Sequence, residues 1–225
     1  MKPIGLIGGT TWVSTQHYYA KLNRAYQQAV GGIASAPIIV HSVDFAPVAA
    51  AQAAENWEHL GQFMGQRARE LEAAGAGAIA IGANTMHLCF DAVQAAVDVP
   101  VLHIGDGIAT TLGHERTLLL GTAFTMAKPF LRAYLTERGC SIALPSASDQ
   151  AWIHDIIYTE LAKDKVTAES RRRFAELASR FDGTRLLLAC TELGLVLDTE
   201  NCDLGLVDSL DCHVQLMLAY LLNQQ

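Results

Sequence analysis

The chain has 225 residues, of which 51% are hydrophobic and 17% are charged, so it has enough apolar side chains for a buried core. Its net charge of −7 argues against nucleic acid and anionic membranes as partners, because both attract clustered Lys and Arg, and no long basic run is present. The apolar stretches are too short for a signal peptide or a membrane span, and the five scattered cysteines are typical of free thiols, which predicts a cytoplasmic location.

Strand-length apolar runs alternate with longer segments of helical period along the chain. This alternation is typical of a parallel sheet covered by helices, so the predicted fold class is α/β. The predicted strands, in chain order, are Ile4–Gly8, Pro37–Ser42, Ala78–Gly82, Val101–Ile104, Arg116–Gly121, Ser141–Leu144, Arg185–Ala189 and Leu204–Val207.

Two predicted helices have informative patterns. The segment Asn56–Ala74 repeats its apolar residues with helical period, and Gly75 is expected to end that helix in a left-handed conformation. The segment Cys212–Leu222 is predicted as a last helix, apolar enough to pack back on the first part of the chain.

The chain also carries an internal similarity at an offset of roughly 110 residues. Gly5–Thr10 resembles Leu118–Thr122, and Ile79–Thr85 resembles Leu186–Glu192. We therefore predict two similar α/β halves, one of residues 1–105 with 208–225 and the other of residues 106–207. Because ligands of parallel sheets bind beyond the carboxyl ends of the strands, the active site is expected in a cleft between the halves.

Cys190 and Ala83 are the informative pair in this internal similarity. Cys190 follows a predicted strand and precedes Thr191, Glu192 and a segment expected to be helical. A helix N-terminus favours a thiolate, so we expect the pKa of Cys190 to lie below the usual value of about 8.5. The equivalent position in the first half is Ala83, which has only a methyl group.

A series of motifs, in this order and spacing, resembles the aspartate/glutamate racemases that work without pyridoxal phosphate. The resemblance runs nearly end to end and rests on Ile4–Thr15, Tyr18-Tyr19, Ser42–Phe45, Asn84–His87, Leu102–Ile104, Gly121–Met126 and Cys190–Gly194. It implies an isomerase that needs no cofactor and acts on a small acidic amino acid, and family members are often dimers, so a homodimer is expected.

The resemblance also implies the catalytic positions. In the family, two acid/base groups flank the α-carbon, and the second of them precedes Thr-Glu, which here is Cys190. The first precedes Asn-Thr and is a cysteine or a threonine, whereas this chain has Ala83. Alanine exchanges no proton, and losing one acid/base group commonly lowers the rate by about 10²–10⁴-fold.

The family further implies which residues hold the substrate. Hydroxyl and amide groups would bind the α-carboxylate, and a basic residue would bind the side-chain carboxylate. The predicted substrate-binding residues are Thr10, Gln52, Asn84, Thr85, Thr122, Thr125, Lys165, Thr191 and Glu192.

Simpler structural roles compete with these. Cys190 could be a buried hydrophobe, Asn84 and Thr85 could cap a helix, and Lys165 lies in a polar run typical of a solvated loop. Gly8-Gly9 lacks the third glycine of a dinucleotide site, and the spacing of cysteines and histidines fits no common zinc site. We interpret Cys89, Cys140, Cys202 and Cys212 as structural thiols and His87, His103 and His213 as packing or supporting groups.

Three interpretations of Ala83 stay open. The chain could be a racemase variant in which alanine was engineered in place of threonine or cysteine, a natural relative with one-sided chemistry, or a protein that binds without turnover. The alternatives to a racemase are thus a one-base lyase resembling the arylmalonate decarboxylases and a catalytically silent protein that binds an acidic ligand.

Overall fold

The computed structural model describes residues 1–181 and 184–224, so residues 182, 183 and 225 of the predicted halves lie outside the described part. The chain divides into two compact units. The first consists of Met1–Ile104 and His213–Gln225, and the second of Gly105–Cys212. The chain therefore returns to the first unit inside its last helix, after the boundary at 208 that the sequence suggested.

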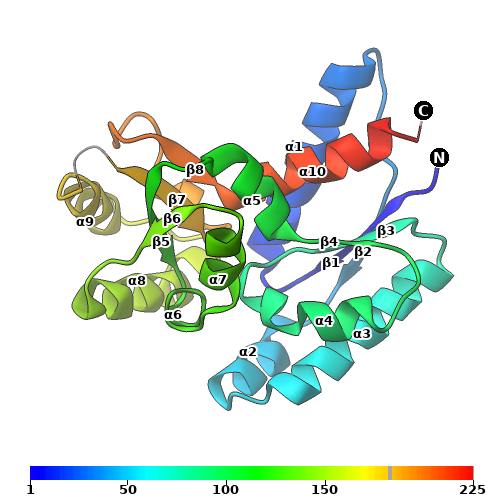
Figure 1. Ribbon diagram of the computed structural model, residues 1–225, viewed down its shortest axis with the longest axis horizontal. Coiled ribbons are helices and arrows are strands. Elements are labelled where there is room, and N and C mark those ends of the chain that lie inside the picture. Colours follow the sequence, from blue (N-terminus) through cyan, green and yellow to red (C-terminus); the bar gives the residue numbers. More distant parts are fainter. Residues whose placement is uncertain (182–183, 225) are drawn as a thin grey trace. The chain divides into compact units, whose positions relative to one another are not determined.

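The first unit is a four-stranded parallel sheet in the order β2-β1-β3-β4. Figure 1 shows α1 and α10 on one face of this sheet and α3 and α4 on the other. Its elements are β1 (Ile4–Gly8), α1 (Trp12–Val30), β2 (Ile38–Ser42), α2 (Phe45–Ala53), α3 (Trp57–Ala73), β3 (Ala78–Ile81), the 3-10 helix η1 (Thr85–Cys89), α4 (Phe90–Gln94) and β4 (Val101–Leu102).

The second unit repeats this topology with a parallel sheet in the order β6-β5-β7-β8. Two helices, α5 (Ile104–Leu112) and α10 (Ser209–Leu222), contain the points where the chain passes between the units. The other elements are β5 (Arg116–Gly121), α6 (Ala123–Ala127), α7 (Phe130–Glu137), β6 (Ser141–Ala143), α8 (Ala147–Thr159), η2 (Leu161–Lys163), α9 (Ala168–Ala178), β7 (Arg185–Ala189), η3 (Leu193–Leu195) and β8 (Leu206–Asp208).

The predicted α/β class is confirmed, and the differences lie at element ends. The strand expected over Val101–Ile104 ends at Leu102, because the Ile104 N–H donates to His87 Nε2 at 3.1 Å and Ile104 begins α5. The last strand, expected over Leu204–Val207, is Leu206–Asp208. The last helix begins at Ser209 rather than Cys212.

The predicted end of the helix over Asn56–Ala74 is confirmed by its capping bonds. Asn56 caps α3 by accepting the His59 N–H at 3.3 Å. At the other end Gly75 has φ +98°, its N–H donates to Glu72 O at 2.9 Å, and the Ala76 N–H donates to Leu71 O at 3.0 Å. These two bonds form a Schellman motif, which needs a glycine at the residue with positive φ.

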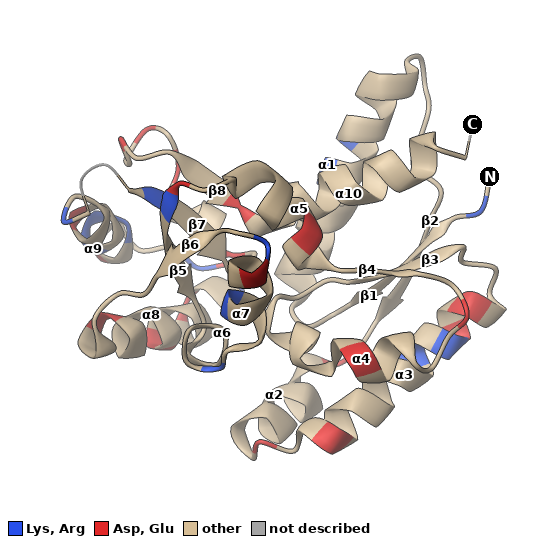
Figure 2. Ribbon diagram, viewed as in Figure 1, with Lys and Arg blue, Asp and Glu red and all other residues tan. Residues whose placement is uncertain are grey.

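The central strands of both sheets are buried, so polar functional groups lie at the strand ends. Every residue of β1 and of β3 is buried, and Figure 2 shows that β1, β3 and β4 carry no charged side chain. In each unit the chain adds its second strand on one side of the first strand and its third strand on the other side. The direction of winding therefore changes between β1 and β3 in the first unit and between β5 and β7 in the second. Ligands of such sheets bind at the carboxyl ends of these two strands. Among the described residues, none of the helices is both long and apolar enough to cross a bilayer.

Candidate active site

In the first unit, a tight turn connects β1 to α1. Gly9 has φ +86°, and its Cα lies so close to Val43 that an added Cβ would collide with the Val43 backbone. Thr10 follows, 8% exposed, and its buried Oγ1 has no hydrogen-bond partner among the described residues. Ser14 Oγ donates to Gly82 O at 3.1 Å and so ties this turn to the end of β3. The turn therefore presents a buried hydroxyl beside the β3 terminus.

The end of β3 carries the residues predicted from the first half. Ala83 is partly buried and packs against the apolar core of its unit, while Asn84 and Thr85 are buried at 4% and 7% exposure. Asn84 stands at the N-cap position of η1 without a side-chain capping bond. Gln52 of α2 is also buried and donates from Nε2 to Met86 Sδ at 3.1 Å, which brings it beside the same segment.

In the second unit, β5 and β7 are paired so that Gly121 lies opposite Ala189. The next residues along each strand, Thr122 and Cys190, are therefore neighbours at the carboxyl end. Thr122 caps α6, because its Oγ1 accepts the Thr125 N–H at 3.2 Å, and the two threonine hydroxyls lie 3.1 Å apart. The register thus brings the predicted Thr122 and Thr125 to the strand end that carries the thiol.

A buried carboxylate accompanies Cys190. The Cys190 Sγ donates to Glu192 Oε2 at 3.1 Å, and the Thr191 hydroxyl donates to the same oxygen at 2.7 Å. Cys190 is 8% exposed, Thr191 8% and Glu192 4%. Two donated hydrogen bonds stabilise a carboxylate in a buried setting. The thiol proton therefore already points at an acceptor able to take it.

The model of the Asp/Glu/hydantoin racemase family matches residues 7–217 of the chain. The chain belongs to this family. A putative Asp/Glu racemase from Yersinia pestis is similar in structure, with 33% identity, a TM-score of 0.89 and coverage of 99% of this chain and 100% of that one. An aspartate racemase homologue from Pyrococcus horikoshii OT3 has 32% identity and a TM-score of 0.82, with 98% and 99% covered.

The broad specificity amino-acid racemase RacX of Bacillus subtilis (strain 168) is a more distant relative, 26% identical over 148 residues. That alignment covers 64% of this chain, and the chain spans 64% of the length of RacX. The match to the Asp/Glu/hydantoin racemase family shows that the chain is a racemase-type isomerase, and it confirms the resemblance that the sequence motifs indicated.

The prediction of a lowered pKa for Cys190 was wrong. Burial and the nearby Glu192 carboxylate raise the pKa of Cys190 well above its usual range. No α-helix begins at Thr191, because only the short 3-10 helix η3 follows and a hydrogen bond joins the Leu193 N–H to Cys190 O. The macrodipole that would lower the pKa is therefore missing, and the resting thiol is protonated at neutral pH.

Two residues of α8 near this site were missed by the sequence analysis. The Ala123 N–H, just beyond β5, donates to His154 Nδ1 at 3.2 Å. Tyr158, one turn later, packs against His154 with tilted rings whose centroids lie 4.7 Å apart. Burial raises the pKa of Tyr158 to about 12, with further contributions from Cys190 and Glu192. The available signal was a His and a Tyr four residues apart, which share one face of a helix.

The predicted Lys165 is exposed to solvent. It belongs to the segment between η2 and α9, and its backbone N–H donates to Glu160 O at 3.1 Å. Its role in binding a side-chain carboxylate stays a prediction. Within the described part of the chain, no group of three or more Cys, His, Asp and Glu side chains forms a metal site.

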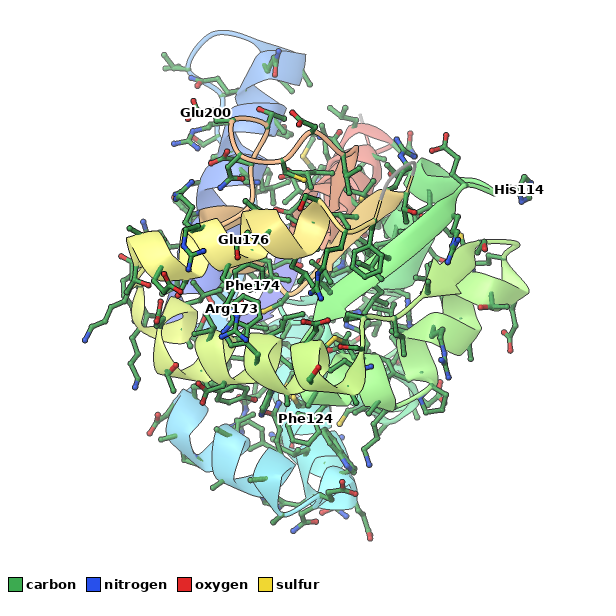
Figure 3. All side chains as sticks on the ribbon, turned by 90° about the vertical axis from the view of Figure 1, so that its left-hand side faces the viewer. His114, Phe124, Arg173, Phe174, Glu176 and Glu200 are labelled. Carbon is green, nitrogen blue, oxygen red and sulfur yellow. The ribbon has the colours of Figure 1, made fainter. Side chains whose placement is uncertain are left out.

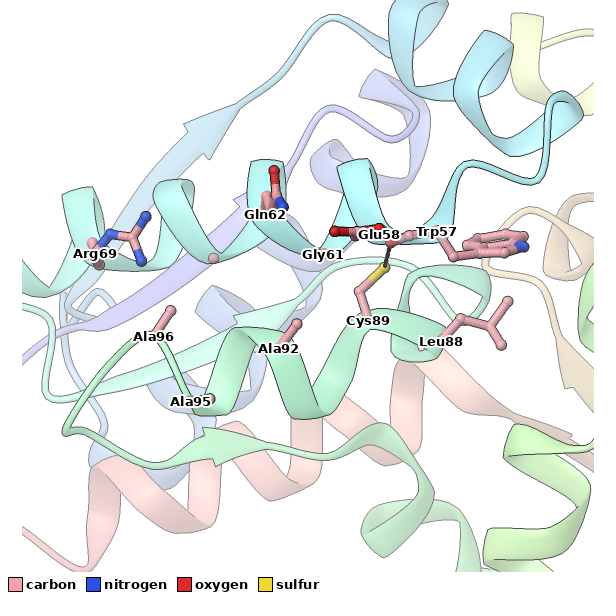
Figure 4. Close-up of a pocket in the computed structure, with 11 residues that line it drawn as sticks. Trp57, Glu58, Gly61, Gln62, Arg69, Leu88, Cys89, Ala92, Ala95 and Ala96 are labelled. Atoms are coloured by element: carbon pink, nitrogen blue, oxygen red, sulfur yellow. Dashed lines mark hydrogen bonds between the residues drawn. The ribbon is translucent and has the colours of Figure 1, made fainter.

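A shallow groove of about 390 Å³ runs along α3 and α4 in the first unit (Figure 4). Its floor is made by small residues, because a Cβ added at Gly61 or Gly65 would meet Ala92 or Ala96. Cys89 lies here, with its Sγ 3.9 Å from Trp57 O, and burial raises its pKa to about 11. We interpret the groove as a close helix contact and Cys89 as a structural thiol.

Proposed function

We propose that the chain is a cofactor-independent amino-acid racemase in which Cys190 exchanges the α-proton on one face of the substrate and position 83 lacks its acid/base group. The substrate class that we infer is a small acidic amino acid, in keeping with the Asp/Glu name of the family. The observation that carries this proposal is the buried Cys190–Glu192 pair at the end of β7, with a sulfur-to-oxygen distance of 3.1 Å.

The proposed chemistry begins with a proton transfer from Cys190 Sγ to Glu192 Oε2. The resulting thiolate then takes the proton from the α-carbon, so the C–H bond breaks and an S–H bond forms. The electron pair spreads into the substrate carboxylate as an enediolate, which hydrogen bonds from hydroxyl and amide groups stabilise. Thr10, Thr122, Asn84 and Thr85 are the groups that we propose for this purpose.

Ala83 determines the expected outcome of the reaction. A thiol that removes the α-proton, exchanges it with solvent and then returns a solvent hydrogen to the same face replaces the α-hydrogen without inverting the α-carbon. Inversion needs a proton on the opposite face, which a methyl group does not supply. We therefore expect α-hydrogen exchange to be faster than racemisation in this protein.

The experiment follows both processes in D₂O with each enantiomer of aspartate and glutamate, and with alanine as the non-acidic comparison. NMR measures loss of the α-proton signal, and chiral chromatography measures inversion. Cys190→Ser should lower exchange by about 10²–10⁴-fold, while Cys202→Ser, a buried cysteine outside the site, serves as the matched control. Ala83→Cys should increase racemisation more than exchange.

Two outcomes would contradict the proposal. Full exchange in the Cys190→Ser variant would remove the thiol from the mechanism. Equal rates of exchange and inversion in the unmodified protein would mean that a second acid/base group acts on the other face.

A second candidate is a one-base lyase, which the methyl group of Ala83 favours. Such an enzyme releases CO₂ from a malonate and needs one thiol to protonate the enediolate that remains. Release of CO₂ from a substituted malonate, without α-proton exchange on any amino acid, would support it over the racemase. Binding of an acidic amino acid with neither reaction would instead support a silent binding protein.

A further inference from the structure

His154 lies on α8, in the same unit as Cys190, and one of its ring nitrogens is an unused hydrogen-bond donor. Its Nδ1 accepts the Ala123 N–H at 3.2 Å, and a ring nitrogen that accepts a hydrogen bond carries no proton. In a neutral imidazole the proton is therefore on Nε2. No hydrogen bond of His154 Nε2 to any described residue is found, and the side chain is only partly buried, so this N–H is accessible to a ligand.

The position of His154 points to the strand ends. Ala123 follows Thr122, which lies just beyond β5, beside Cys190 at the end of β7. The Phe124 ring meets the His154 ring edge to face, with centroids 5.9 Å apart. Figure 3 shows Phe124 on the edge of α8 away from α9, whereas Phe174 and Arg173 fill the space between α8 and α9. His154 therefore belongs to the end of the sheet where ligands of this fold bind.

The surroundings keep this imidazole neutral. Protonation would place a hydrogen on Nδ1, opposite the Ala123 N–H, so a favourable contact would become two opposed donors. Burial also lowers the pKa of His154. The neighbouring Tyr158, with a pKa of about 12, stays protonated as well. Neither group competes with Cys190 for the α-proton.

We propose that His154 is a substrate-binding residue that donates Nε2–H, as a neutral imidazole, to a carboxylate oxygen of the amino acid at the carboxyl end of β5. This assignment rests on the proposed racemase function. A neutral donor suits an enzyme with a single acid/base thiol, because it polarises the carboxylate without offering a second acidic proton.

Two substitutions separate the functions of the two ring nitrogens. The Asn side chain in His154→Asn has an oxygen near the position of Nδ1, so it can still accept the Ala123 N–H, but it has no donor at the position of Nε2. The longer amide of His154→Gln reaches the position of Nε2 and can donate there. We expect KM for exchange of the aspartate α-proton to rise about 10-fold or more in His154→Asn and less than about 3-fold in His154→Gln. His114, an exposed histidine whose ring bonds to Gly139 O, provides the control variant His114→Asn.

A spectroscopic readout distinguishes binding from folding and from turnover. In the full chain labelled with ¹⁵N-histidine, His154 should show an unprotonated Nδ1 and a protonated Nε2 at pH 7, and L-aspartate should shift the Nε2 signal. An Nδ1–H tautomer, an imidazolium, or equal KM values in the Asn and Gln variants would overturn the assignment. If the protein catalyses no exchange while L-aspartate still shifts Nε2, the racemase proposal fails and the binding role of His154 stands.

Discussion

At the residue scale, Cys190 and Glu192 show how local contacts reverse an expectation from sequence. The motif Cys-Thr-Glu after a strand predicted a reactive thiol, but its predicted low pKa relied on a helix that does not form. The two groups share one buried hydrogen bond, and the Glu192 carboxylate makes ionisation of the Cys190 thiol more costly. The carboxylate is therefore better suited to accept the thiol proton than to coexist with a thiolate.

This coupling can be tested with Glu192→Gln. Removing the carboxylate charge should lower the pKa of Cys190, so alkylation of this cysteine by iodoacetamide at a fixed pH near 8 should become faster. Exchange of the α-proton should become slower, because the amide takes no proton from the thiol. Mass spectrometry of the Cys190 peptide measures the alkylation. The exposed Glu200, labelled in Figure 3, provides the control Glu200→Gln, which should change neither rate. Slower alkylation in Glu192→Gln would contradict the assigned electrostatics.

At the scale of elements, the carboxyl ends of the strands are shaped by close backbone approach. Gly9 joins β1 to α1 with φ +86°, and its N–H donates to Thr15 Oγ1 at 2.7 Å. The turn lies against Val43, which follows β2 and whose own N–H donates to Gly8 O at 3.0 Å. A side chain at residue 9 would therefore separate the two loops that frame Thr10.

Gly9→Ala and Gly31→Ala form a matched pair that isolates this packing. The two glycines have similar φ values, +86° at Gly9 and +88° at Gly31, but an added Cβ would collide with Val43 O at Gly9 and would meet nothing within 4 Å at Gly31. Gly31→Ala should cost about 1 kcal/mol of unfolding free energy from backbone strain alone. Gly9→Ala should cost at least about 2 kcal/mol more, measured by urea denaturation. Equal losses would show that the loop contact with Val43 is unimportant.

At the scale of the whole molecule, a buried histidine joins the two ends of the chain within the first unit. His213 Nε2–H of α10 donates to Leu102 O of β4 at 3.0 Å, and its Nδ1 accepts the Tyr18 hydroxyl of α1 at 2.9 Å. His87 lies beside it, accepts the Ile104 N–H at Nε2 and donates from Nδ1 to Ala83 O at 2.9 Å. The last helix is therefore fixed to the segment that holds position 83.

These contacts predict a loss of stability in acid. Burial, with a smaller effect of His87, lowers the pKa of His213 to about 3, against about 6.5 in the unfolded chain. The unfolded state binds more protons between these values, so the contribution of His213 is complete above pH 6.5 and declines as pH falls toward 3. The decline is about 1.4 kcal/mol per pH unit at most.

The test compares the unfolding free energy at pH 7 and pH 5 by urea denaturation. His213→Gln should be less stable than the unmodified chain at pH 7 and should lose less on acidification. His114→Gln, at an exposed position, should keep the full pH dependence. An unchanged slope in His213→Gln would assign the acid sensitivity to other groups.

The sequence by itself determined the α/β class, the two repeated sheets, the end of α3 at Gly75 and the family, because apolar period, glycine positions and motif order are local properties of the chain. It also singled out Cys190, Ala83 and Glu192. The catalytic roles of positions 190 and 83 stay predictions, as do the homodimer, the absence of a cofactor and the cytoplasmic location. The predicted substrate-binding roles that also remain untested are those of Thr10, Gln52, Asn84, Thr85, Thr122, Thr125, Lys165, Thr191 and Glu192.

Only the tertiary structure decided the protonation state of Cys190, the tautomer of His154 and the buried contacts of His213. Each depends on which polar atom lies opposite a nitrogen or sulfur after folding, and on how much water has been excluded there. Residues distant in sequence make these contacts, such as Ala123 with His154 and Tyr18 with His213. A pattern of residue types along the chain specifies which groups are available, whereas a pKa or a tautomer follows from distances of about 3 Å that exist only in the packed molecule.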